Sequence, residues 1–178
     1  MQQANGNRLQ VTWKNFILEQ VNSKNSPGWF IWDQPEEYPS RTMRAHRLVE
    51  AARMQGPEAY ARLHYALLEG RHEHRKDLAD PGDLWAIAGS MELDLERLRR
   101  DAADHARLDT IAADHLGALK LGVFGTPTFI FDNGSSFFMR IKAPDAVDEA
   151  ARVFEGLYDL FVQRSIIGEV KRPRPPVA

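Results

Sequence analysis

The chain contains the stretch Gly122-Val123-Phe124-Gly125-Thr126-Pro127-Thr128-Phe129-Ile130-Phe131, in which a proline follows two glycines and a threonine. A long amphipathic helical pattern precedes it, and β-rich sequence follows it. Because proline cannot donate a hydrogen bond to a β-ladder, Pro127 is expected at the first residue of a strand. Thr126–Pro127 is therefore a candidate cis peptide, since X-Pro bonds adopt the cis form at a modest free-energy cost.

Strands are predicted on both sides of the chain's helical middle. Alternating apolar and polar residues predict one strand over Arg8–Leu18. Two more are expected at Thr128–Phe131 and Ser136–Ile141, joined as an antiparallel hairpin. The Asn133-Gly134 pair between them is the sequence signal of a two-residue hairpin turn.

Between these strands, apolar residues recur at the i, i+3, i+4, i+7 spacing of helices with one buried face. Ser40 is a plausible N-cap for the first helix, and Gly122 is placed to end the fifth as its C′ residue. The helices are predicted from Ser40 through Ala52, Pro57 to Gly70, Pro81 to Met91, Leu93 to Ala103 and Leu108 to Leu119, with a sixth starting at Pro144. Asn22–Ser40, which carries Trp29, Phe30 and Trp32, is expected to be a long loop, either functional or packed by its own side chains.

Bulk properties narrow the class of protein. The chain has 178 residues, which suits one domain, and its net charge of −2 does not favour nucleic acid or an anionic membrane as a partner. The segment Met1–Asn7 is polar and lacks the apolar region of a secretory signal. No apolar run approaches the length of a membrane span. These features predict cytoplasmic residence.

The conspicuous polar residues do not predict a metal or cofactor site. His72 and His74 flank Glu73, but side chains at i and i+2 of a helix diverge, and a metal needs three or four convergent ligands. A solvated helix end is the favoured interpretation. His64 and His115 are interpreted as satisfied core histidines, and the adjacent pair Asp114-His115 cannot act as a dyad on one helix.

Gly122–Phe129 resembles the cis-proline loop of the thioredoxin fold, and the helix before it and hairpin after it resemble the DsbA-like branch of disulfide oxidoreductases. Val11–Asn22 resembles the second strand of that branch and the loop leaving it. The resemblance covers roughly residues 8–172 and implies a single α/β domain: a thioredoxin-like sheet with an all-helical insert. In this domain 8–22 and 122–165 are the thioredoxin core, 40–121 the helical insert and crossover, and 166–178 a tail.

The family's Cys-x-x-Cys motif is missing, together with the first βα unit that should lie before residue 8, and the chain has no cysteine. Since thiol–disulfide exchange requires a thiolate, the chain as written is expected to be inactive in that reaction. Three explanations stay open. An upstream segment of a longer product carries the cysteines, the lineage kept only a non-catalytic peptide- or protein-binding surface, or the protein is a relative of the glutathione-dependent isomerases and transferases.

In the family, the backbone beside the proline pairs with an extended peptide or a thiol substrate. The resemblance therefore makes Gly125, Thr126 and Pro127 the candidate substrate-binding residues, the alternative being a purely structural turn. The missing strand is central in the family's sheet, so its loss would expose strand edges that recruit other chains. We expect a homodimer with Trp13 and Phe16 in its interface, or else a shift of Arg8–Leu18 to pair with Thr128–Phe131.

Overall fold

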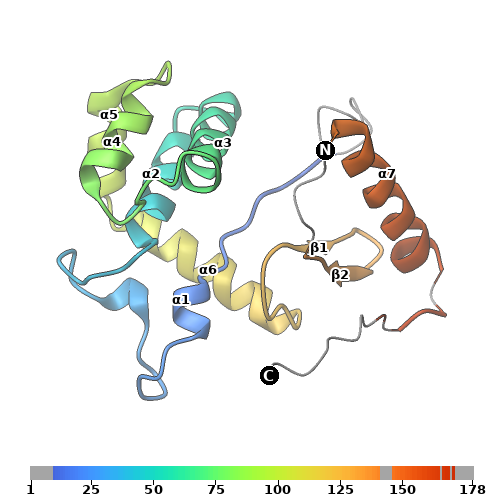
Figure 1. Ribbon diagram of the computed structural model, residues 1–178. Coiled ribbons are helices and arrows are strands. Elements are labelled where there is room, and N and C mark those ends of the chain that lie inside the picture. Colours follow the sequence, from blue (N-terminus) through green and yellow to red (C-terminus); the bar gives the residue numbers. More distant parts are fainter. Residues whose placement is uncertain (1–9, 141–145, 165, 169, 171–178) are drawn as a thin grey trace, which may run out of the picture. The chain divides into compact units, whose positions relative to one another are not determined.

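The computed structural model describes residues 10–140, 146–164, 166–168 and 170 (Figure 1). Its chain forms two compact units, a helical unit of residues 14–124 and a hairpin unit of residues 125–178 together with 1–13. The expectations for Met1–Asn7, Ile141, Pro144 and most of the tail lie outside the described residues.

The helical unit contains each of the five predicted helices, coloured cyan to yellow in Figure 1. α2 is the central one, because it contacts α3, α5 and α6 and buries Ala45, Leu48, Val49 and Ala52. The helical segments of this unit are α1 (Leu18–Val21), η2 (Ile31–Asp33), α2 (Met43–Arg53), α3 (Pro57–His72), α4 (Pro81–Gly89), α5 (Leu95–Ala103) and α6 (Ala106–Lys120).

Short-range capping sets several of these helix ends. The N-cap of α2 is Thr42 and not Ser40 as predicted, although the Ser40 hydroxyl accepts a hydrogen bond from the Met43 N–H, the first of the helix, at 3.0 Å. α6 ends in a Schellman motif, in which the Val123 N–H donates to the Ala118 carbonyl at 3.1 Å. Gly122 has a φ of 78°, a conformation that glycine adopts without a Cβ clash.

Gly70 does not end α3, contrary to the prediction. The helix continues to His72, and a Cβ at Gly70 would lie 2.7 Å from the Ile87 Cδ1 of α4. This glycine therefore marks the place where two helices pack closely, because a larger side chain would have to displace the end of the Ile87 side chain.

The core of the helical unit lies under the long loop 22–40. Phe30 and Trp32 stack with their ring centroids 5.1 Å apart, so this loop is packed by its own aromatic side chains. The buried cluster consists of Ile17, Ile31, Trp32, Met43, Leu108 and Ile111, with Trp29, Phe30, Tyr38 and Ala112 packed against it.

The predicted strand Arg8–Leu18 is wrong over the residues that the structure describes. Residues 10–17 form no strand, and the chain enters α1 at Leu18. Two backbone donors of the segment bind side chains of α6 instead: the Asn15 N–H donates to the Asp114 carboxylate at 3.1 Å and the Ile17 N–H donates to His115 Nδ1 at 3.0 Å. The alternative in which this segment pairs with the Thr128 strand is also wrong, because β1 has only β2 as a described partner.

The hairpin unit consists of β1 (Thr128–Ile130) and β2 (Ser136–Phe138), followed by α7 (Val147–Tyr158) and a π-helical turn, η3 (Asp159–Gln163). The strands are antiparallel, with Phe129 opposite Phe137. Phe137, Met139 and Phe154 are its buried core, with the apolar residues Phe129, Phe131, Leu157, Phe161 and Val162 against them. Together with the helical unit, this small sheet confirms the α/β class.

The hairpin turn is longer than the predicted two-residue turn. A type I′ turn needs positive φ at both Asn133 and Gly134, but of this pair only Gly134 has it, at 82°. The Gly134 N–H donates to the Phe131 carbonyl, and the Phe131 N–H donates to the Ser135 carbonyl, both at 2.9 Å. The turn is therefore built around one left-handed glycine, the pattern of the three-residue hairpin loops.

Candidate functional site

The loop before β1 is held on both sides of Thr126. Its Thr126–Pro127 peptide bond is cis, as expected from the sequence. The Thr128 hydroxyl donates to the Gly125 carbonyl at 2.7 Å, and the Met139 N–H donates to the Pro127 carbonyl at 3.2 Å. Hydrogen bonds inside the hairpin unit thus fix the residues that flank Thr126.

Thr126 itself is exposed, as is Pro127, whereas Gly125 is buried. Neither the N–H nor the C=O of Thr126 forms a hydrogen bond with any other residue that the structure describes. A Cβ at Gly125 would lie 3.1 Å from Phe138 Cε2, so the glycine allows the loop to lie against that ring. The arrangement leaves one donor and one acceptor of the backbone for a group outside the hairpin.

A second polar cluster lies inside the helical unit and is centred on Asn15. Its Nδ2 donates to Glu50 Oε1 at 2.9 Å and to Asp114 Oδ2 at 3.1 Å. Since this nitrogen faces two carboxylates, the Asn15 Oδ1 must be the acceptor from His46 Nδ1, at 2.8 Å. One amide therefore connects α2, α6 and the segment before α1.

Glu50 carries a buried carboxylate, and only 2% of the surface of this residue is exposed to solvent. Arg53 binds it through Nε at 2.9 Å and Nη2 at 3.1 Å, and the guanidinium lies 3.7 Å from the centre of the Tyr60 ring. Burial raises the pKa of Tyr60 to about 12. Burial also lowers the pKa of His46 to about 4, more than Glu50 raises it. The histidine is therefore neutral at pH 7 and the carboxylate is fully paired.

Asp114 and His115 point to different groups, so they do not form a dyad. Asp114 binds Lys14 Nζ at 2.8 Å and the Asn15 backbone, whereas His115 accepts from Ile17. His115 is a satisfied core histidine, as predicted, with 1% of its surface exposed. The sequence held no signal for its partner, because the two bonded residues lie 98 positions apart.

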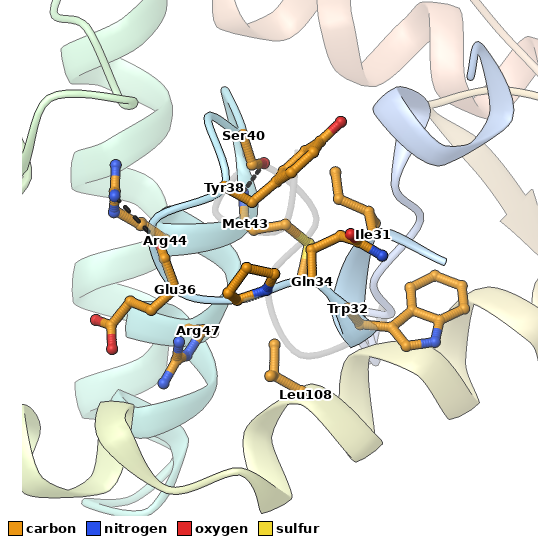
Figure 2. A pocket seen from close by; sticks show the side chains of 11 residues that line it. Ile31, Trp32, Gln34, Glu36, Tyr38, Ser40, Met43, Arg44, Arg47 and Leu108 are labelled. Atoms are coloured by element: carbon orange, nitrogen blue, oxygen red, sulfur yellow. Dashed lines mark hydrogen bonds between the residues drawn. The ribbon is translucent and has the colours of Figure 1, made fainter. Parts of the chain in front are cut away.

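A small cavity lies beneath the loop 22–40 and is lined by Trp32, Met43 and Leu108 (Figure 2). Its volume of about 30 Å³ has room for about two water molecules and none for a cofactor. Arg44 borders it and donates to the backbone carbonyls of Ala79 and Glu36. The cavity is thus part of the loop's packing and does not offer a substrate site.

The cluster from Arg71 to Arg75 lies at the exposed C-terminal end of α3. Its His74 ring is 3.7 Å from the Glu69 carboxylate, and both side chains are exposed. Among the described residues, no group of three or more histidine, aspartate or glutamate side chains could hold a metal ion. No helix in the described part of the chain is long and apolar enough to cross a membrane.

The predicted dimer interface has to be corrected at Phe16. This ring is buried, with 8% of its surface exposed, and it stacks on His115 at 4.8 Å between centroids. It belongs to the core of the helical unit, because its partner ring and the neighbouring Ile17 are both buried. Phe16 is therefore not available to a second copy of the chain.

Comparison with known proteins identifies the fold family. The family model of the DSBA-like thioredoxin domain matches residues 30–152, which is more than half of the chain. The chain is also similar to the ClpXP adapter protein SpxH of Bacillus subtilis (strain 168), with 26% identity over 136 residues. That match covers 76% of this chain and 44% of the relative, so the chain spans less than half the length of that protein. The chain belongs to the DsbA-like thioredoxin family.

Proposed function

We propose that this chain is a binding module of the DsbA family, which captures an extended polypeptide at Gly125, Thr126 and Pro127 without thiol–disulfide exchange. The observation that carries the proposal is the exposed Thr126, whose N–H and C=O have no partner among the described residues. A free donor and acceptor on one residue can pair with the backbone of an extended peptide.

The bracing of the loop supports this function. The bonds from Thr128 to Gly125 and from Met139 to Pro127 hold the site before any ligand arrives. A site that is already ordered loses less conformational entropy on binding. The similar protein from Bacillus subtilis is named as an adapter, and an adapter needs binding surfaces. Cytoplasmic residence and a homodimer are further parts of the proposal.

The backbone N–H of Thr126 can be removed selectively. Thr126→Pro is expected to weaken binding of an unfolded polypeptide with alkylated thiols by about tenfold or more, because one hydrogen bond is lost and its peptide partner is left unsatisfied. Thr126→Val keeps the backbone donor and the branched shape, and should bind like the unchanged protein. Isothermal titration calorimetry measures both affinities.

Amide NMR locates the site independently of these variants. Addition of the same alkylated polypeptide should shift the Thr126 and Thr128 amide signals of the unchanged protein. Equal affinities of the proline and valine variants would show that the loop is not part of the binding site. Amide shift changes confined to the helical unit would show the same.

Thiol–disulfide exchange is expected to be absent from this chain. Insulin reduction by dithiothreitol should proceed at the same rate with and without the protein, since the sequence holds no cysteine to form the attacking thiolate. Turbidity of the precipitating insulin B chain reports the rate. An accelerated reaction would show that a redox chemistry without cysteine exists here and would contradict the proposal.

A further inference from the structure

Two histidines on different helices, the buried His115 and the half-buried His46, hold the same short segment of the helical unit. His46 of α2 donates from Nδ1 to the Asn15 side chain at 2.8 Å. His115 of α6 accepts at Nδ1 from the Ile17 N–H at 3.0 Å. Only the His115 bond requires a neutral ring, because a proton on His115 Nδ1 would replace the acceptor by a second donor, whereas His46 would still donate from Nδ1 when protonated.

The surroundings of the two rings disfavour positive charge. His115 lies between Phe16 and Trp32, with ring centroids 4.8 and 5.3 Å away. Burial lowers the pKa of His115, as it does that of His46. The titratable and charged groups near the pair are Lys14 on the segment, Glu50 and Arg53 on α2, Tyr60 and His64 on α3, and Asp114 on α6.

Glu50 is the group that favours a proton on His46, while His64 and His115 oppose it. The carboxylate of Glu50 is already bound by Asn15 and by two nitrogens of Arg53. Burial is the largest influence on His46, so the net effect of its surroundings keeps the ring neutral.

The segment held by the histidines in turn holds the long loop 22–40. Gln20 donates from Nε2 to the Trp29 carbonyl at 3.1 Å and accepts at Oε1 from the Ile31 N–H at 2.8 Å. Glu19 accepts from the Ser40 hydroxyl at 2.8 Å and from the Arg41 N–H at 3.1 Å. Residues 14–21 are thus bound to α2 and α6 at one end, and at the other end they bind the middle and the C-terminal end of the loop 22–40.

We infer that residues 14–21 form an acid-released strap, in which protonation of His115 breaks its bond to Ile17, frees the strap from α6 and thereby opens the loop 22–40. Proton uptake by His46, once the strap no longer covers it, favours the same open state. The device is independent of the peptide site proposed at Thr126. Its closed state is the neutral one, and its open state is the state in which both imidazoles reach water and can take up protons.

The direction of the pH effect follows from linkage. A histidine whose pKa is lower in the closed state than in the open state stabilises the closed state at pH values above 6.5. This stabilisation is lost as the pH falls below 6.5. For His46, with a pKa of about 4 when clamped and 6.5 when released, the opening equilibrium should rise about twentyfold between pH 7 and pH 5. His115 adds to the effect in the same direction.

Hydrogen exchange followed by mass spectrometry on the full chain tests the strap. After correction for the intrinsic pH dependence of exchange, peptides covering residues 14–21 and 22–40 should lose protection by about tenfold or more between pH 7 and pH 5. Peptides from α3 and α4 should keep their protection. Constant protection of the strap, or equal loss in every peptide, would overturn the inference.

Asparagine variants separate protonation from other effects of acid. Asn carries a donor and an acceptor that do not titrate, so the double variant His46→Asn, His115→Asn should exchange at a rate that is independent of pH over this range. His105→Asn is the matched control, because His105 is exposed and precedes α6, and it should behave like the unchanged protein. An acid response that persists in the double variant would also overturn the inference.

NMR of the unchanged protein gives a readout that does not depend on the folding of these variants. The imidazole signals of His46 and His115 should titrate below the ordinary pKa of histidine. The chemical shifts of these signals should change over the same pH range in which the Ile17 amide signal leaves the chemical shift that it has in the closed state. If both rings titrated with the ordinary pKa of histidine while the Ile17 amide signal stayed unchanged, the inference of an acid-released strap would be wrong.

Discussion

Replacing Asn15 by alanine is expected to lower the free energy of unfolding by about 3 kcal/mol. The substitution removes the donor that binds Glu50 and Asp114 and the acceptor that binds His46. Glu50 is buried and keeps Arg53 alone among the described residues, so part of its desolvation is no longer compensated. Urea unfolding followed by circular dichroism measures the change.

Two further variants show whether the effect belongs to the polar network. Asn15→Asp has nearly the same size but puts a third carboxylate between Glu50 and Asp114, so it should cost more than alanine at pH 7. Asn25→Ala, on the exposed part of the long loop, should change stability by at most about 0.5 kcal/mol. A loss below about 1 kcal/mol for Asn15→Ala would mean that water replaces the amide at little cost.

Phe137→Ala is expected to destabilise the hairpin unit by about 3–5 kcal/mol. The Phe137 ring is buried and lies 5.1 Å from Phe129, 5.7 Å from Phe131 and 5.8 Å from Phe161, measured between centroids. Its removal leaves a cavity in a core that has three buried members among the described residues. Loss of hydrogen-exchange protection in residues 128–138 should report the damage.

The same variant connects the core to the proposed function. The loop at Thr126 is held by bonds from Thr128 and Met139, which the hairpin positions, so peptide binding should fall together with protection of the strands. Ser136→Ala, on the exposed side of β2, is the control and should leave both measurements unchanged. If Phe137→Ala bound the peptide with unchanged affinity, the loop at Thr126 would not depend on the core of the hairpin unit.

The sequence predicted best where the responsible interactions are short. The five helices of the middle region follow from apolar spacing and from end signals such as Gly122, which act within about one helical turn. The hairpin was likewise predicted, although its turn is longer than the Asn133-Gly134 pair indicated. Gly70 was misjudged because a glycine that ends a helix and one that admits a neighbouring helix look alike in sequence.

Only the tertiary structure decided what the segment before α1 does. Its alternating pattern favours a strand, yet a strand needs a neighbour for its N–H and C=O groups, and here the N–H groups of Asn15 and Ile17 bind side chains of α6. Those partners lie 99 and 98 positions away, far beyond the range of any local pattern. The sequence alone determined the helices, the hairpin and the exposed loop at Thr126, because these features depend on interactions between residues that are close in the chain. The burial that brings Asn15, His46, Glu50 and Asp114 into one network arises only when α2 and α6 pack together.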